Sequence, residues 1–237
     1  MANEIKAFEG FPKEGFRFFR ELKVNNNREW FQDHRQEYID FLQTPAVSFV
    51  VELGERLKSE FPNISYDTRT NGAGSVMRIY RDIRFSKDKT PYKDHLGVNL
   101  WDGPGKKASP GFHFFMDTNS AAFYGGYHVF PKEYLAAYRD AVSDDLRGED
   151  LVGALGELSK TEGFEVGGDQ LKRVPPGFDQ EHARGDLLRY KGMWVKSPPL
   201  TREILESPKL VDMCAKHAHT IGPVHHWFVD VNRTVPH

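Results

Sequence analysis

The chain has 237 residues, and its 32 lysines and arginines against 34 aspartates and glutamates give a formal net charge of -2. That balance argues against bulk electrostatic attraction to DNA or to an anionic membrane surface. Hydrophobic residues make up 39% of the sequence and charged residues 28%, which is typical of a folded globular protein and excludes a disordered chain.

The single cysteine and the short apolar runs indicate in which cellular compartment the protein is expected. Cys214 has no second cysteine with which to form an internal disulfide, and no CxxC zinc pattern is present. Charged residues interrupt the first eleven positions, and apolar runs such as 46–51 are too short to span a membrane. We therefore expect a cytoplasmic protein with no membrane partner, and we predict neither a cofactor nor an oligomeric state.

The first quarter of the chain is predicted to be helical. Pro12 opens a first helix through KEGFRFFRELK, because proline is tolerated in the first helical turn. After the asparagines at 25–27, the stretch REWFQDHRQEYIDFLQ places its apolar residues at helical spacing and predicts a second helix. Thr44 is the expected cap of a third helix that ends before Pro62.

From position 64, short β-favouring runs replace the helical pattern. Clusters of Gly, Pro, Asn and Asp separate these runs, so we expect an antiparallel meander. The five segments are ISYDTR (64–69), VMRIY (76–80), HLGVNLW (95–101), GFHFFMD (111–117) and AAFYGGYHV (121–129). Gly125 and Gly126 in the last run fit either a β-bulge or the close approach of a ligand to the backbone.

Helical patterns return after Pro131. KEYLAAYRDAVSDDL predicts one helix, and a second is expected after a cap at Asp150. A further strand is predicted at 187–195, and the tail at 208–231 predicts a long helix with a weak point near Pro223.

The order of these elements indicates the fold class. Helices lie at both ends of the chain and strands lie together in the middle, which favours an α+β fold over a parallel βαβ architecture. We predict a central antiparallel sheet meander flanked by N-terminal and C-terminal helices, within a single domain that covers residues 1–237.

One segment, RIYRDIRFSKDKTPYK at 78–93, concentrates positive charge in an otherwise acidic chain. It carries six basic and two acidic residues, or +4 in sixteen positions. Such a concentration can attract an anion. Arginine forks and lysine ammonium groups together suit a phosphoryl group. The proposed charged ligands of the anion are Arg78, Arg81, Arg84, Lys87, Lys89 and Lys93.

Aromatic and acidic residues complete this segment. Tyr80, Phe85 and Tyr92 are suited to stacking on a base or a sugar. Asp82 lies between arginines that favour its ionised form, so we expect it to orient an arginine rather than to act as a general acid. The alternative is a solvated hairpin whose charges pair among themselves, each exposed pair contributing about 0 to 1 kcal/mol.

Four sequence blocks resemble a known family. They are FEGFP at 8–12, NNNREWF at 25–31, RIYRDIRFSKDKTPYK at 78–93 and LKRVPPGFD at 171–179. Together they are similar to a family of conserved hypothetical proteins, domain of unknown function twenty-four sixty-one, over residues 8 to 195. The resemblance implies a single soluble domain and implies no activity, cofactor or catalytic residue.

The remaining blocks suggest further members of the same site. We hypothesise that Asn27, Arg28 and Trp30, at a helix start that favours anions, join the loop cations together with Lys172 and Arg173. The alternative for the first three is an asparagine cap followed by a core tryptophan. A turn before two prolines explains the last two residues equally well.

Histidine and cysteine patterns give no metal or nucleophile motif. The pairs His217/His219 and His225/His226 have spacings that point their rings apart on a helix, so we predict no metal site. His219 and His226 are seven apart, and a half-buried surface helix accounts for them. His113 and His128 are expected to be satisfied histidines within the sheet, and Cys214 is expected in the core.

The sequence therefore favours a protein that binds a phosphate-bearing or other anionic small ligand. If the protein is an enzyme, phosphoester or nucleotide chemistry is the expected reaction type, because Arg and Lys side chains stabilise the charge of a phosphoryl group during its transfer. A module that binds single-stranded nucleic acid is the first alternative, although the near-neutral charge argues against it. A structural or interaction protein with a solvated charged loop is the second.

Overall fold

The computed structural model describes residues 5–235, which form two compact units. Unit 1 comprises residues 5–100, 113–123 and 199–216, and unit 2 comprises residues 101–112, 124–198 and 217–235. Each unit is described by itself below, and the single domain stays a prediction.

The described strands form a six-stranded sheet with the order β1-β2-β3-β4-β6-β5. The strands β2, β3 and β4 are consecutive in the chain and adjacent in the sheet, as in the predicted meander, and β6 pairs antiparallel with both β4 and β5. The α+β prediction is thus confirmed. The strands are β1 (Ile64–Ser65), β2 (Leu96–Asp102), β3 (Gly111–Met116), β4 (Ala121–Tyr127), β5 (Glu165–Gly167) and β6 (Met193–Lys196).

The helices of unit 1 follow the predicted order but not all of the predicted boundaries. They are α1 (Lys13–Val24), α2 (Arg28–Asp33), α3 (Arg35–Tyr38), the π-helix η1 (Ile39–Gln43), α4 (Thr44–Leu57) and α8 (Arg202–Leu205). The predicted second helix is therefore divided, with a break at His34. The predicted cap at Thr44 is wrong, because η1 runs directly into α4 and Thr44 already has helical backbone angles.

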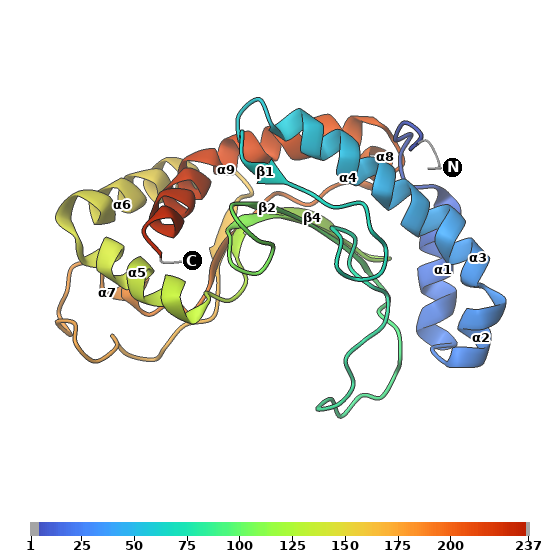
Figure 1. Ribbon diagram of the computed structural model, residues 1–237, viewed down its shortest axis with the longest axis horizontal. Helices are drawn as coiled ribbons and strands as arrows, with labels where there is room; N and C mark the ends of the chain where they lie inside the picture. The colour runs from blue at the N-terminus through green and yellow to red at the C-terminus, as the bar shows by residue number, and fades with distance from the viewer. Residues whose placement is uncertain (1–4, 236–237) are drawn as a thin grey trace. The chain divides into compact units, whose positions relative to one another are not determined.

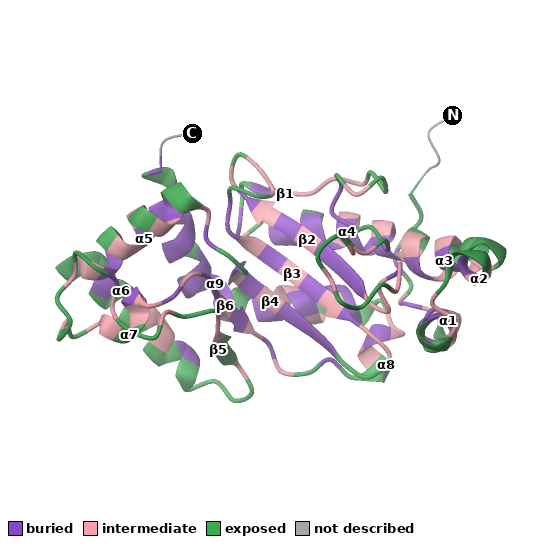
Figure 2. Ribbon diagram, turned by 90° about the horizontal axis from the view of Figure 1, so that it is seen from below, coloured by how far each residue is buried: buried purple, intermediate pink, exposed green. Residues whose placement is uncertain are grey.

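The core of unit 1 lies between α4 and one face of the sheet (Figure 1). The rings of Phe49 on α4 and Phe114 on β3 are 5.0 Å apart, and Phe11 stacks on Phe114 at 5.8 Å. All three side chains are fully buried. Alternation along β3 places His113 and Phe115 on the opposite face, where both are only half-buried (Figure 2).

Unit 2 contains α5 (Lys132–Ser143), α6 (Asp145–Ser159), α7 (Gly185–Leu188) and the larger part of α9 (Lys209–Arg233). The long C-terminal helix is confirmed and continues through Pro223. The predicted cap at Asp150 is wrong, because Asp144 accepts the hydrogen bond from the Arg147 amide and α6 begins earlier.

Two predicted strands also differ from the structure. Residues 76–80 form no regular strand, because they make only the isolated bridges Val76↔Val98 and Tyr80↔Tyr92. The predicted strand at 187–195 is split, because its first residues belong to α7 and the strand itself begins at Met193.

The two glycines of β4 are required by packing inside unit 2. A Cβ atom at Gly125 would lie 2.6 Å from the Ile221 side chain of α9. At Gly126 it would lie 2.4 Å from the Met193 carbonyl oxygen, and this residue has a positive φ of 121°. The groups that approach the backbone at these glycines are therefore Ile221 and Met193 of the protein's own core.

The buried polar residues of unit 2 include a pair that the sequence did not indicate. His225 Nε2 lies 3.1 Å from Asp102 Oδ2, and the Phe112 ring stacks on the imidazole at 4.4 Å. His217 and His225 are the buried histidines of α9, whereas His219 and His226 are exposed.

Other predictions about single residues can be compared directly. Cys214 is fully buried, as expected, and burial raises the pKa of its thiol. His113 lies in β3 and its Nδ1 is 2.7 Å from Asn99 Oδ1, which confirms a satisfied sheet histidine. The same prediction is wrong for His128, because β4 ends at Tyr127 and His128 is exposed. Among the described residues, every helix is too short or too polar to cross a membrane.

Candidate functional site

The charged segment at 78–93 lies in unit 1 and folds back on itself. The Arg81 amide donates to the Pro91 carbonyl oxygen at 2.9 Å, and the Lys93 amide donates to the Ile79 carbonyl oxygen at 2.8 Å. These contacts close a loop whose two ends are held side by side. We call residues 78–93 the basic loop.

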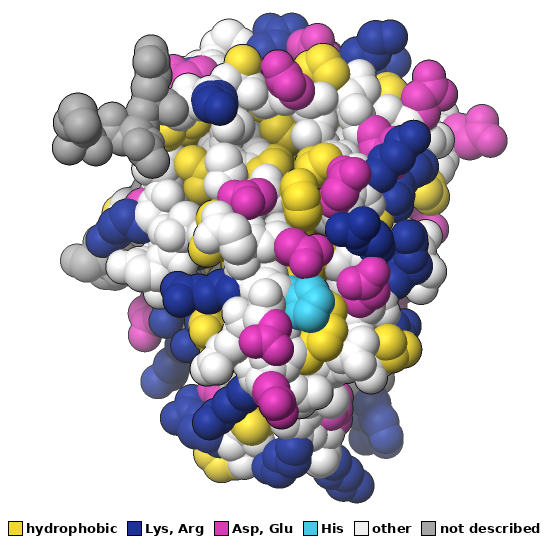
Figure 3. Space-filling view, turned by 90° about the vertical axis from the view of Figure 1, so that its right-hand side faces the viewer, with side chains coloured by type: hydrophobic (Ala, Val, Ile, Leu, Met, Phe, Trp, Pro, Cys, Tyr) yellow, Lys and Arg dark blue, Asp and Glu magenta, His cyan; other side chains and the backbone are white. Residues whose placement is uncertain are grey.

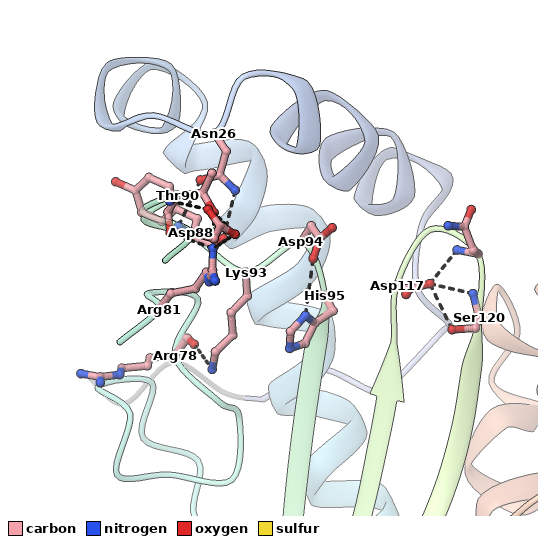
Figure 4. Close-up of polar contacts among 12 residues, drawn as sticks. Asn26, Arg78, Arg81, Asp88, Thr90, Lys93, Asp94, His95, Asp117 and Ser120 are labelled. Carbon is pink, nitrogen blue, oxygen red and sulfur yellow. Dashed lines mark hydrogen bonds and ion pairs between the residues drawn. The ribbon is translucent and has the colours of Figure 1, made fainter. Parts of the chain in front are cut away.

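Arg81 supports the basic loop from within. Its Nη1 donates to Asp88 Oδ2 at 2.5 Å, to the Thr90 carbonyl oxygen at 3.2 Å and to the Thr90 hydroxyl (Figure 4). Only 26% of its side chain is exposed. Because Nη1 is already engaged by Asp88 and Thr90, Arg81 is a structural residue of this loop more than a ligand-binding one.

Arg84 is paired with Asp82 through two contacts. Arg84 Nη2 lies 2.6 Å from Asp82 Oδ2, and Arg84 Nε lies 2.9 Å from Asp82 Oδ1. Hydrogen bonds from the Arg84 side chain and backbone lower the pKa of Asp82 to about 2. Asp82 therefore contacts an arginine, as the sequence analysis expected, and its role at a binding site stays a prediction.

The lysines of the basic loop differ in their contacts. Lys89 Nζ donates to the Ile83 carbonyl oxygen at 2.9 Å, and Lys93 Nζ donates to the Arg78 carbonyl oxygen at 2.9 Å. Both ammonium groups therefore donate to backbone carbonyl groups of the loop. Lys87 is exposed.

Three exposed cations lie outside these pairs. Within residues 5–235, no carboxylate forms an ion pair with Arg28, Arg78 or Lys87. Figure 4 shows the Arg78 side chain pointing away from Arg81 and Lys93. The predicted set of cations therefore separates into paired and unpaired members.

Three aromatic rings of the asparagine-rich block and the basic loop pack against one another. The Tyr80 ring lies 5.3 Å from Tyr92 and 6.2 Å from Phe31, and Phe31 stacks on Tyr92 at 4.1 Å. Tyr80 is 52% exposed, so one side of its ring faces solvent. Phe85 is 96% exposed, with the Arg84 guanidinium 5.8 Å from its ring centroid.

The asparagine-rich block and the basic loop meet, as hypothesised. Asn26 Nδ2 donates to the Tyr92 carbonyl oxygen at 3.0 Å, and the Tyr92 amide donates to Asn26 Oδ1 at 3.1 Å. Asn27 caps α2 by accepting from the Trp30 amide at 2.9 Å, and Trp30 stacks on His34 at 4.1 Å. The residue that joins the two blocks is thus Asn26, which the sequence hypothesis did not include.

Lys172 and Arg173 belong to unit 2, where both side chains are exposed. Their membership of the same site stays a prediction. No group of three or more His, Cys, Asp or Glu side chains in the described part of the chain is arranged to hold a metal ion.

The surface around the basic loop is richer in positive charge than the surface above it. Figure 3 shows Lys and Arg side chains around the lower end of this face, where Figure 1 places the basic loop, and side chains of both signs above. A local concentration of Lys and Arg in a chain of net charge -2 is the arrangement that the sequence predicted.

A second residue that sequence reasoning missed is His95. It follows Lys93 and Asp94 at the start of β2, and its ring lies 5.1 Å from Phe115. The sequence feature that could have identified His95 is its position: it is an ionisable side chain directly after the basic loop, where strand alternation begins.

The family model described as "Conserved hypothetical protein (DUF2461)" matches residues 14–227. The chain belongs to this family. The match extends to Trp227 and so includes most of α9, which the resemblance over residues 8–195 had left out. The basic loop and the asparagine-rich block both lie within the part matched by the DUF2461 family. A comparison with curated proteins finds no match.

Proposed function

We propose that unit 1 binds a phosphate-bearing or otherwise anionic small ligand beside Tyr80. The supporting observation is the separation of the cations into two groups. Arg81 and Arg84 form ion pairs within the basic loop, whereas Arg28, Arg78 and Lys87 form no ion pair with a carboxylate among the described residues. Exposed cations close in sequence to an exposed ring are suited to an anionic group carried on a planar or sugar moiety.

The proposal assigns different roles to the predicted residues. Arg78 and Lys87 contact the anion, with Arg28 at the adjoining end of α2. Tyr80 supplies the stacking surface, and Tyr92 and Phe31 support it from behind. Arg81, Asp82, Arg84 and Lys89 hold the loop in its conformation, and Lys93 ties the end of the loop to the Arg78 backbone.

A thermal-shift series tests the proposal. The additives are phosphate, sulfate, mononucleotides, sugar phosphates and short single-stranded oligonucleotides. A ligand at 100 times its Kd stabilises the folded state by about 2.7 kcal/mol, which raises Tm by about 5 °C or more at this chain length. Arg78→Glu is expected to abolish the shift, while Lys132→Glu, an equal charge change at an exposed position of unit 2, retains it.

The exposure of Phe85 favours a second candidate, the binding of single-stranded nucleic acid. A fully exposed ring next to an arginine is suited to stacking on an unpaired base. In that case only oligonucleotides stabilise the protein, binding weakens steeply with salt, and Phe85→Ala weakens it. If no anion of either kind changes Tm, both candidates fail and the basic loop is a structural or interaction element.

A further inference from the structure

One face of the sheet in unit 1 carries ionisable side chains, and no helix of the described residues covers it. Strand alternation directs Phe114 toward α4 and leaves His113 and Phe115 on the other face. Figure 2, seen from that side, shows β2 and β3 with no helix in front of them. This face is defined here by Lys93, His95, Asn99, His113 and Phe115.

Gly97 lets the Met77 and His113 side chains pack closely against the backbone of β2 on this face. A Cβ atom there would lie 2.5 Å from Met77 Sδ and 3.1 Å from the His113 ring. A larger side chain would therefore displace both neighbours. His95 lies on the same side of the chain, two positions before Gly97, and packs against Phe115 at 5.1 Å between ring centroids.

The face is continuous with the basic loop through Lys93. Lys93 Nζ donates to the Arg78 carbonyl oxygen at 2.9 Å, which ties the start of β2 to the segment that carries Arg78. Figure 4 shows Lys93 and His95 side by side at the edge of the loop. The positive charge of Lys93 also acts on the imidazole, because it is one of the causes that lower the pKa of His95.

We propose that Lys93 and His95 form an oxyanion-binding position at the edge of the basic loop, with His95 as its titrating member. The inference rests on the proposed function, because it extends the same anion site. The ligand class is a sulfate, phosphate or carboxylate group, and a ring attached to it would lie toward Phe115.

The charged groups around His95 set the direction of the pH effect. Burial and Lys93 lower its pKa below the ordinary value of 6.5, whereas Asp94, with Oδ1 3.6 Å from Nδ1, and Asp117 raise it. The Asp117 carboxylate also accepts from the Ser120 amide at 2.7 Å. The imidazole is therefore mainly neutral at pH 7, and a bound anion favours its protonated form, so affinity must increase as the pH falls.

Sulfate is the probe, because its charge does not change between pH 5 and 8. Its Kd is measured by calorimetry across that range for the full-length chain, and the imidazole of His95 is titrated by NMR with and without sulfate. We expect the Kd to fall about tenfold toward pH 5, the equivalent of a one-unit rise in the pKa of His95 on binding. His95→Gln removes most of this pH dependence, and His128→Gln, at an exposed histidine of unit 2, leaves it unchanged.

The outcomes separate this inference from the proposed function. Sulfate binding that Arg78→Glu weakens, with an equal pH dependence in His95→Gln and the unmodified protein, overturns the role of His95 and leaves the proposed function standing. No sulfate effect on Tm or on the His95 resonance overturns this inference. If every other anion of the thermal-shift series also fails, the proposed function falls with it.

Discussion

The basic loop of unit 1 and the buried contacts of unit 2 use charged groups in opposite ways. In the loop, Arg84 and Asp82 pair while 75% and 46% of their side chains stay exposed. In unit 2, the side chains of His225 and Asp102 are 0% and 5% exposed. Exposed pairs contribute little to stability, whereas a buried polar group that loses its partner is costly. The basic loop therefore keeps its charged groups at the surface, whereas the polar pair in the core of unit 2 serves stability.

The largest effect is expected at the buried pair. Asp102→Ala leaves the His225 imidazole buried without this partner, and we expect the free energy of unfolding to fall by about 3 kcal/mol. Urea denaturation followed by circular dichroism measures the change. Asp88→Ala in the basic loop is the comparison and should leave the midpoint almost unchanged. Equal losses in the two variants would remove the contrast between the regions.

A smaller loss is expected at Arg184, the most deeply buried arginine for which an ion pair is described. Its Nε donates to the Val142 carbonyl oxygen at 2.7 Å and its Nη2 to the Ser143 carbonyl oxygen at 3.3 Å, so it satisfies the last turn of α5. Arg184→Met should lower the free energy of unfolding by about 2 kcal/mol. Arg233→Met, which removes an exposed pair with Asp230, is the control and should cost much less. Equal urea midpoints for the two variants would show that the bonds from Arg184 to the end of α5 do not stabilise the protein.

The smallest effect is expected at Asp82, where the change is in titration. The hydrogen bonds from Arg84 lower the pKa of Asp82 from 3.8 to about 2. Because the folded-state pKa is depressed, the pair stabilises the protein above pH 4 and this contribution is lost as the pH falls toward 2. NMR titration of the carboxyl carbon should give a midpoint near 2, returning toward 3.8 in Arg84→Gln. A midpoint that is the same in both proteins would show that Arg84 does not hold Asp82.

Local patterns predicted much of the fold. Pro12 and the spacing of the phenylalanines indicated α1, and alternation indicated β2 to β4. The pairing of Asp82 with an arginine could also be predicted, because the partners are two residues apart. These features depend on neighbours in the sequence.

The features that were missed depend on distant residues. Asn26 and Tyr92 are 66 positions apart, and Asp102 and His225 are 123 apart, so no local pattern marks either contact. Residues 76–80 have strand-like alternation, but their pairing is limited to isolated bridges. Which cations of the basic loop are neutralised also depended on how the loop folds, which the count of charges does not specify.

The most direct test of the account compares unpaired with paired cations of the basic loop. Arg78→Gln removes a cation that has no described acidic partner, whereas the double variant Asp82→Asn/Arg84→Gln removes a complete pair and leaves the net charge unchanged. The measurement is the Kd, by calorimetry, of the mononucleotide or sugar phosphate that gives the largest thermal shift. The account predicts that Arg78→Gln raises this Kd about tenfold or more, the loss of one charge-assisted contact, and that the double variant changes it less than about twofold. Equal weakening by the two variants, or weakening by the double variant alone, would contradict it.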